Sequence, residues 1–181
     1  MENKPPWSQS NTTLPFTRCL AGHSDFTPLI FNYPKRTGET SQSHQIGTAI
    51  SYTTSMQNIA GDPQYILTNP AVEIIKSIPT DWDETVVLPM SKIGDLLGFA
   101  RRKGNTWFVT LLNGDTVQPK KVTLKLSFLG SGTFKADVIK DDMSDMNAII
   151  QDSFSVTSAD SYTIQMRGGG GWVGRFIGTT K

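Results

Sequence analysis

The chain has 181 residues, of which 37% are hydrophobic and 18% are charged, and its formal net charge is +1. This length suits one ordinary domain or two small ones, and the near-neutral charge provides no field that would attract nucleic acid, so no nucleic-acid partner is expected. No apolar run approaches the ~20 residues of a membrane span, and the first residues show no signal-peptide pattern, which a fragment would lack in any case.

Residues 1–13 are polar and are predicted to form a loop. Pro5 and Pro6 restrict the backbone angles and remove hydrogen-bond donors, and Trp7 is the one large aromatic anchor. Glu2 in this segment is either a frayed terminal glutamate or a functional residue, for a reason given below.

A buried strand that ends in a functional loop is predicted for residues 14–28. The apolar run is entered at Pro15, Gly22 permits a close backbone approach, and Pro28 closes the segment. In a barrel, Asp25 would follow the strand at the end that faces the substrate. Asp25 is therefore a candidate pocket residue, and the alternative is an Asx-turn or cap that bonds its own loop.

A helix over residues 44–59 is predicted after a turn-rich surface loop. Ser41 or Ser43 can cap it, and its apolar positions fall partly on one side. His44 stands at the helix start, where it either lines a sugar site or packs near the cap.

A second, short helix is predicted to end before Pro79. Asn69 suits the N-cap position and Pro70 the first helical position. Two helices around a turn fit the outer layer of an α/β barrel, because the strand that precedes them needs covering.

After Glu84 the hydrophobic period becomes two, which predicts an antiparallel β-domain with one apolar face or a small sandwich. Lys103-Gly104-Asn105 is a hairpin signal, and a charged loop interrupts the pattern over residues 141–152. The expected strands cover residues 95–102, 106–113, 121–128, 134–138, 162–166 and 172–177.

The glycine run over residues 168–171 is predicted to be a wide hairpin turn. A phosphate-binding loop would need Lys-Ser/Thr and a helix directly after it, and neither follows.

Trp82 lies among the acidic residues Asp81, Asp83 and Glu84. An aromatic ring could stack on a sugar beside two carboxylates, as glycoside hydrolysis requires. The alternative is that Trp82 packs the helical half of the chain against the β half, and this is the interpretation we favour from its place at the junction.

Several short motifs along the chain occur in an unbroken order. They read L-P-F-T-R-C-L-A-G-H-S-D-F-T-P, H-Q, S-M-Q, I-P-T-D-W-D-E-T and A-R-R-K-G. In this order they resemble the C-terminal part of glycoside hydrolase family 97. Members of that family are large, often periplasmic α-glycosidases with an N-terminal β-sandwich, a (β/α)8 barrel, a C-terminal β-domain and an active-site calcium. The resemblance implies that the chain is a piece of such an enzyme.

The resemblance also implies roles for three residues. In the family a Gly-x-Glu motif precedes the L-P-F-T-R stretch, and its Glu serves as general acid and, in some members, as a calcium ligand. Glu2 falls in this place, preceded by Met1, so it is the implied catalytic residue and the implied ligand of Ca²⁺. Asp25 and His44 are the candidate substrate-binding residues, and most calcium ligands would lie outside this chain.

The expected fold class is α/β plus all-β. Residues 1–83 are predicted to be the C-terminal remnant of a (β/α)8 barrel, since a complete barrel needs at least ~200 residues, and residues 84–181 an antiparallel β-sandwich-like domain. The expected function is that of a C-terminal fragment of a glycoside hydrolase acting on α-glycosidic bonds of oligosaccharides, inactive by itself. The alternative is a non-catalytic structural or oligomerisation β-module with a vestigial barrel segment. The resemblance implies a periplasmic or secreted location and allows a homo-oligomer.

Overall fold

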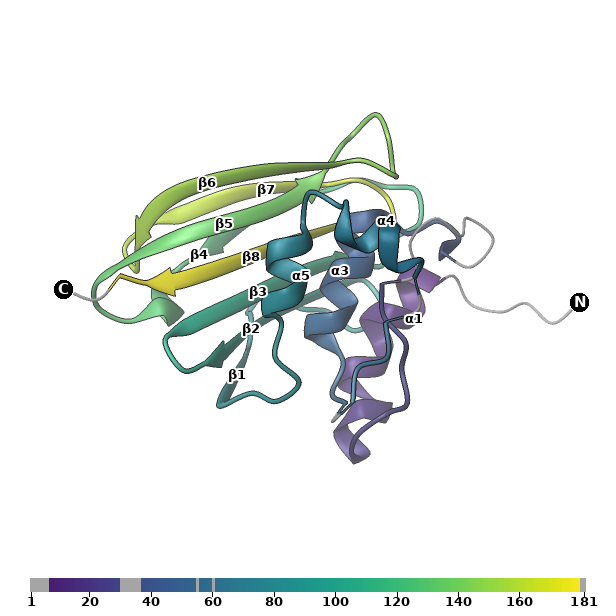
Figure 1. The fold of residues 1–181 in the computed structure, drawn as a ribbon, viewed down its shortest axis with the longest axis horizontal. Helices are drawn as coiled ribbons and strands as arrows, with labels where there is room; N and C mark the ends of the chain where they lie inside the picture. The colour runs from purple at the N-terminus through teal and green to yellow at the C-terminus, as the bar shows by residue number, and fades with distance from the viewer. Residues whose placement is uncertain (1–6, 30–36, 55, 60, 180–181) are drawn as a thin grey trace, which may run out of the picture.

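The computed structural model describes residues 7–29, 37–54, 56–59 and 61–179, and its centre is an antiparallel β-sheet (Figure 1). Six strands form the main sheet in the order β1-β2-β3-β8-β5-β6, and two more form a small sheet, β4-β7. The strands are β1 (Glu84–Val87), β2 (Leu96–Lys103), β3 (Thr106–Asn113), β4 (Lys120–Lys125), β5 (Thr133–Asp141), β6 (Ile149–Thr157), β7 (Ser161–Met166) and β8 (Gly171–Gly178).

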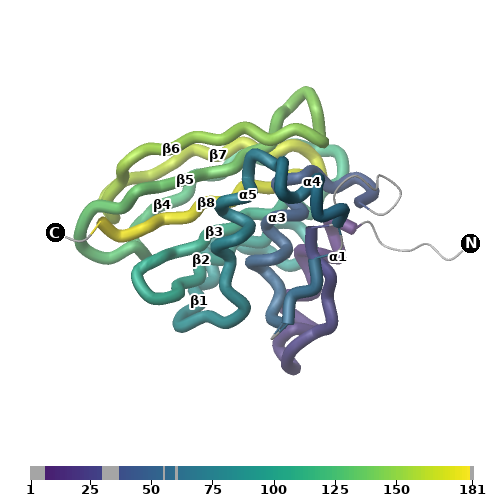
Figure 2. Tube along the Cα trace, viewed as in Figure 1, coloured from purple at the N-terminus to yellow at the C-terminus, as the bar shows by residue number. Residues whose placement is uncertain are grey.

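The helices gather on one face of the main sheet, opposite the small sheet (Figures 1 and 2). α3 packs on β3 and β8, and α1 lies beside it next to β2 and β3. The helices are α1 (Trp7–Thr13), α3 (Gln42–Ser51), α4 (Pro63–Leu67) and α5 (Val72–Ser77), with short 3-10 turns η1 (Leu14–Phe16), η2 (Arg18–Ala21) and η3 (Ser127–Leu129). The main sheet is therefore the middle of three layers.

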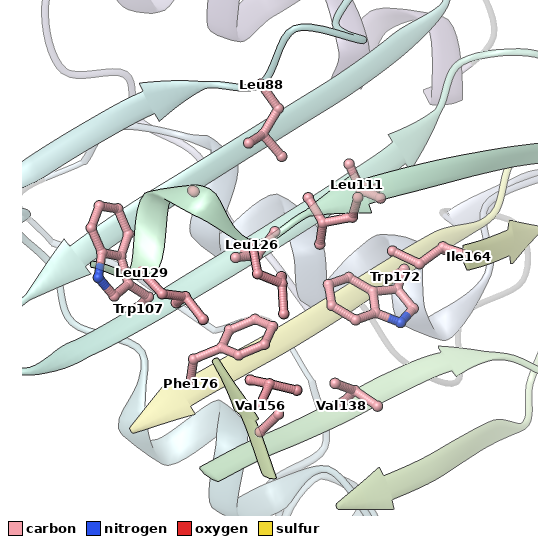
Figure 3. Close-up of a cluster of buried hydrophobic side chains, with 14 of the residues drawn as sticks. Leu88, Trp107, Leu111, Leu126, Leu129, Val138, Val156, Ile164, Trp172 and Phe176 are labelled. Carbon is pink, nitrogen blue, oxygen red and sulfur yellow. The ribbon is translucent and has the colours of Figure 1, made fainter. Parts of the chain in front are cut away.

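The larger hydrophobic core lies between the two sheets. Strand side chains alternate between the two faces of a sheet, so Trp107 and Leu111 of β3 point toward the small sheet. Figure 3 shows them gathered with Trp172 and Phe176 of β8 around Leu126, which follows β4.

A second hydrophobic cluster fills the space between the main sheet and the helices. Phe108 of β3 points to this face, and the apolar stripes of α3 and α5 cover it. Because both faces of β3 are covered, its residues are buried at nearly every position instead of at every second one. The buried members are Leu29, Ile46, Ala49, Ile50, Ala71, Ile74, Ile75, Phe108, Ile139 and Val173.

The β half of the chain follows the sequence prediction closely. β2 and β3 form the predicted hairpin, with Lys103 opposite Thr106 and Gly104 at a φ of 56°, which glycine adopts without strain. The prediction missed β6, because residues 149–152 were assigned to the charged loop. β1 also forms, as a short edge strand directly at the predicted boundary.

The strand predicted for residues 14–28 is wrong. The segment forms the 3-10 turns η1 and η2, in which the N–H of Thr17 bonds the carbonyl of Leu14 and the N–H of Leu20 bonds the carbonyl of Thr17. Pro15 stands in the first turn of η1, where its missing N–H costs nothing. Among the described residues, no strand precedes Glu84, so the expected barrel remnant is not confirmed and the confirmed fold is a mainly antiparallel β-domain with a few helices.

Residues 7–13 and 168–171 also differ from the sequence prediction, and α4 is a helix that was not predicted. Residues 7–13 form the helix α1 instead of a loop, since the restricting prolines lie before it and Thr12 and Thr13 turn their hydroxyls onto backbone carbonyls one turn earlier. The turn over residues 168–171 joins β7 of the small sheet to β8 of the main sheet, so it crosses between layers and is not a hairpin turn.

The helices are shorter than expected but their capping is partly as predicted. Ser41 caps α3, since its side chain accepts the N–H of His44, and α3 ends at Ser51, well before Ile59. α5 begins after Asn69, whose side chain accepts the N–H of Ala71.

Trp82 lies at the junction between the helices and the main sheet. Its half-buried ring packs edge-on against Phe108 with 5.5 Å between ring centres, and the guanidinium of Arg101 lies 5.7 Å from the ring centre. Residues before and after Glu84 thus share one hydrophobic cluster. The division into domains 1–83 and 84–181 stays a prediction.

Trp82→Ala is expected to lower the free energy of unfolding by about 2–3 kcal/mol, less than the ~3–5 kcal/mol of a fully buried tryptophan, because the ring is half-buried. Urea denaturation followed by circular dichroism measures it. Trp7→Ala is the matched control, since Trp7 is 54% exposed, and it should cost no more than about 0.5 kcal/mol. Equal losses in the two variants would contradict the junction role of Trp82.

Candidate functional site

The three predicted site residues do not come together in the described part of the chain. Glu2 lies outside the described residues. Asp25 is exposed on the loop after η2, and this loop is held by a backbone bond from Ser24 to Thr53 and by Phe26, whose ring stacks on Tyr52 at 3.9 Å between centres. His44 is completely buried at the start of α3.

A chain of hydrogen bonds connects His44 to Tyr52, whose ring stacks on Phe26 of the loop that carries Asp25. The hydroxyl of Tyr52 lies 3.0 Å from Asn11 Oδ1, Asn11 Nδ2 lies 3.1 Å from His44 Nε2, and His44 Nδ1 lies 3.1 Å from the carbonyl oxygen of Gly170. A carbonyl oxygen only accepts, so Nδ1 carries the proton and Nε2 accepts from the amide of Asn11. This arrangement requires a neutral imidazole.

The environment of His44 keeps the ring neutral. Burial lowers the pKa of His44 to about 4, against the opposing effects of the Gly170 carbonyl and the carboxylate of Glu39. A ring whose two nitrogens are both engaged by protein partners positions its neighbours and does not exchange protons at neutral pH. Its contacts are those of a packed histidine, and its role in substrate binding stays a prediction.

A buried carboxylate, Asp141, holds the glycine turn against the start of α3. It accepts the hydroxyl of Ser41 at 2.6 Å, the N–H of Gly171 at 3.0 Å and the N–H of Arg167 at 3.1 Å. Burial raises the pKa of Asp141. The backbone of residue 171 lies close to the backbone of α3. Only glycine fits there, because a Cβ at Gly171 would lie 2.7 Å from the Cα of His44. Asp141 thus joins one side chain and two backbone N–H groups, and this network, which we call the lock at Asp141, fixes the helix to the sheets.

Sequence reasoning missed Asn11, Tyr52 and Asp141. Asn11 lies in a polar stretch typical of loops, and Asp141 stands at the edge of the predicted charged loop, where a solvated carboxylate is the ordinary expectation. Of the residues in this network, only Ser41 was predicted from the sequence, as one of two candidates for the N-cap of the helix.

The acidic residues around Trp82 are paired with the basic end of the β2–β3 hairpin. Lys103 Nζ lies 2.6 Å from Asp81 and 3.2 Å from Asp83, and Arg102 Nε lies 3.1 Å from Glu84. The backbone N–H of Gly104 and the side chain of Lys103 lower the pKa of Asp83. A carboxylate held ionised in this way is unsuited to act as a general acid.

An apolar groove opens at the edge of the sandwich, where β1 of the main sheet lies near β4 of the small sheet. Its volume is about 500 Å³. Val86, Leu88 and Met90 form one wall, and Leu124 and Phe128 are part of the other. No motif in the sequence marks this groove, although the apolar run over residues 86–88 contributes a wall. It is the candidate interaction surface of the chain.

Within the described ranges, no three His, Cys, Asp or Glu side chains gather as a metal site would require. A calcium ion takes six to eight oxygen ligands, so the described residues do not by themselves provide the implied calcium site. No helix in the described part of the chain is long and apolar enough to cross a membrane.

The three layers define the chain as an antiparallel β-domain with a helical cover. The family model "Glycosyl-hydrolase 97 C-terminal, oligomerisation" matches residues 81–177, which include every strand from β1 through β7 and most of β8. The chain therefore belongs to glycoside hydrolase family 97, as its C-terminal part.

Curated relatives and solved structures agree with this assignment. The chain is 30% identical to a probable retaining alpha-galactosidase of Streptomyces bingchenggensis, over 91% of this chain and 25% of the relative. It is 24% identical to the retaining alpha-galactosidase of Bacteroides thetaiotaomicron, over 88% of this chain and 26% of the relative. A family 97 enzyme from Pseudoalteromonas sp. strain K8, solved with acarbose, is similar with a TM-score of 0.87 and 27% identity, over 96% of this chain and 29% of that one. The chain thus spans about a quarter of the length of the curated relatives that it matches.

The buried, neutral His44 predicts a specific pH dependence of stability. The folded pKa of about 4 lies below the ordinary 6.5, so between these values the unfolded chain binds a proton that the folded chain refuses. Stability contributed by His44 is complete above pH ~6.5 and is lost as the pH falls toward ~4, by about 2–3 kcal/mol. Urea unfolding between pH 4 and 7.5 measures this loss.

His44→Gln should remove this part of the pH dependence, although its stability at pH 7 is lower. His23→Gln is the matched control, since His23 is the other histidine of the chain and is exposed. It should follow the parent at every pH. A His44→Gln curve parallel to the parent would show that His44 is not held neutral.

Proposed function

We propose that the chain serves as the C-terminal part of an α-glycosidase of family 97, where it supports assembly while another part of the enzyme supplies most of the catalytic residues. One observation carries the proposal. The family model described as a C-terminal oligomerisation domain covers nearly the whole β part of the chain, and the chain spans only about a quarter of the matched retaining alpha-galactosidases.

The proposed substrates of the whole enzyme are oligosaccharides with α-glycosidic bonds, with α-galactosides as the first choice. Retaining glycosidases use two carboxyl groups about 5–5.5 Å apart, one as nucleophile and one as acid and base. We assign the acid role to Glu2, and the nucleophile then comes from outside this chain. Support for Glu2 comes from its place before the L-P-F-T-R stretch.

Asp25 and His44 are proposed to contribute to the substrate side of the same enzyme in different ways. Asp25 is exposed and can meet a ligand directly. The contacts of His44 suit a positioning role, because it orients Asn11 and through it Tyr52, whose ring stacks on Phe26 next to Asp25.

Glu2 is also the residue that we propose as a ligand of Ca²⁺. The remaining ligands would lie outside the chain, in keeping with the six to eight oxygens that calcium needs. A periplasmic or secreted location is proposed on the family resemblance alone.

The second candidate is a structural or oligomerisation module without a catalytic role of its own. The apolar edge groove favours it, since such a surface suits a protein partner better than a sugar. The two candidates differ in whether Glu2 takes part in chemistry.

The purified chain is expected to show no turnover of aryl α-galactosides or α-glucosides above a Glu2→Gln control. The reason is that retaining hydrolysis needs a second carboxylate in register with the first, and this proposal places it outside the chain. A chromogenic assay measures turnover, with an established α-galactosidase at equal molarity as positive control and circular dichroism to establish folding. Robust hydrolysis that Glu2→Gln abolishes would overturn the proposal that the catalytic pair is divided.

A further inference from the structure

The strand β1 presents unpaired backbone groups at an edge of the main sheet. Among the described strands, β1 pairs only with β2, and the N–H of Leu88 bonds the carbonyl of Gly98. Hydrogen-bonded and non-hydrogen-bonded pairs alternate along an antiparallel ladder, so Val86 and Glu84 also turn their backbone groups toward β2. The N–H and C=O groups of Thr85 and Val87 therefore face outward.

The second half of this edge, Val86 and Val87, is apolar and lies beside the groove. Val87 is 52% exposed, and Val86, Leu88 and Met90 line the groove of about 500 Å³. Phe128 and Leu124 line it from the side of the small sheet, with the exposed Lys125 at its rim. An exposed apolar edge next to an open apolar groove is an energetically poor surface to leave in water.

The other three sheet edges are more polar than the valine half of β1. On β7, the exposed residues Ser161, Thr163 and Gln165 are all polar. β4 carries the exposed lysines Lys121 and Lys125, a common device that prevents edge-to-edge association. β6, at the far edge of the main sheet, is mostly polar, and Gln151 on it bonds the carbonyl of Pro70. β1 has the sequence E-T-V-V with neither Lys nor Pro.

We propose that β1 and the groove beside it form the interface with a second copy of this chain, which pairs β1 with β1 antiparallel across a two-fold axis. The inference rests on the assembly role in the proposed function and names the surface that performs it. Two identical surfaces that meet in this way close the assembly as a dimer.

The outward-facing residues determine the register of this pairing. Thr85 faces the partner's Val87, and Val86 lies on the two-fold axis, because this register joins outward-facing groups on both strands. Val86 then meets the partner's Val86 beside the mouth of the groove, which places apolar surface from both copies in contact. The formal charge of +1 per copy causes little repulsion between them.

The test compares self-association of the full chain, Val87→Lys and Val117→Lys by sedimentation equilibrium. A lysine on an edge strand opposes pairing, so Val87→Lys should raise the dimer dissociation constant at least ~10-fold. Val117→Lys is the matched control. Val117 is 72% exposed on the loop after β3, does not line the groove, and should change the dissociation constant less than about twofold.

Hydrogen exchange of the parent chain gives a second measurement that needs no variant. The amides of Thr85 and Val87 should exchange more slowly as protein concentration rises through the dissociation constant, while those of β6 remain unchanged. Dimers that persist in Val87→Lys, or protection that develops on β6, would overturn the assigned surface but leave the assembly role intact. A parent chain that stays monomeric at millimolar concentration would overturn both.

Discussion

The contact between Asp141 and the start of α3 is the constraint on which the other packing depends. One buried carboxylate accepts the cap hydroxyl of Ser41 together with the N–H groups of Gly171 and Arg167, so it joins the helix to the end of β7 and the start of β8. Arg101 bonds the carbonyl of Ile50 at the other end of α3, at 2.7 Å. A negative charge near a helix N-terminus and a positive charge near its C-terminus interact favourably with the helix dipole. Asp141 and Arg101 supply these two charges, so residues of the sheet stabilise α3 at both ends.

This arrangement explains why buried polar groups are tolerated on the helical face. Once α3 is fixed, His44 meets Gly170 and Asn11, and Asn11 in turn meets Tyr52. These bonds join the side chains of His44, Asn11 and Tyr52 to acceptors, so the desolvation cost of these three side chains is offset by hydrogen bonds in a medium of low dielectric constant. The apolar cluster under α3 and α5 then supplies most of the free energy that holds the helices on the sheet, at roughly 1.5–3 kcal/mol for each fully buried isoleucine. The hydrogen bonds of Asp141 determine where along the sheet α3 sits.

The sequence predicted the β half of the fold much better than the helical half. β4 and β5 are visible from alternation, because burial of one strand face leaves a period of two, and β2 and β3 are visible as apolar runs on either side of the glycine turn at Gly104. α1 is invisible, since its side chains are polar and it depends on bonds from Ser8 to Glu39, distant in sequence. The same limit applies to the site: the cap at Ser41 is local and was predicted, whereas Asp141 became important only through a partner 100 residues away.

Two kinds of surface follow from the way that the layers are covered. The helical face of the main sheet is covered by residues that precede β1. The apolar side chains on this face are therefore buried within the same chain. At the free edges the chain uses charge or polarity on β4, β6 and β7 but leaves the valine half of β1 apolar, in a domain whose family is described by its oligomerisation. Edge strands of soluble proteins normally carry charges or other features that prevent pairing with another strand. An edge strand without them, beside an apolar groove, is best explained by a binding partner. The position of β1 directly after the helical layer also means that pairing there would extend the main sheet without disturbing the lock at Asp141, so assembly and internal packing remain independent.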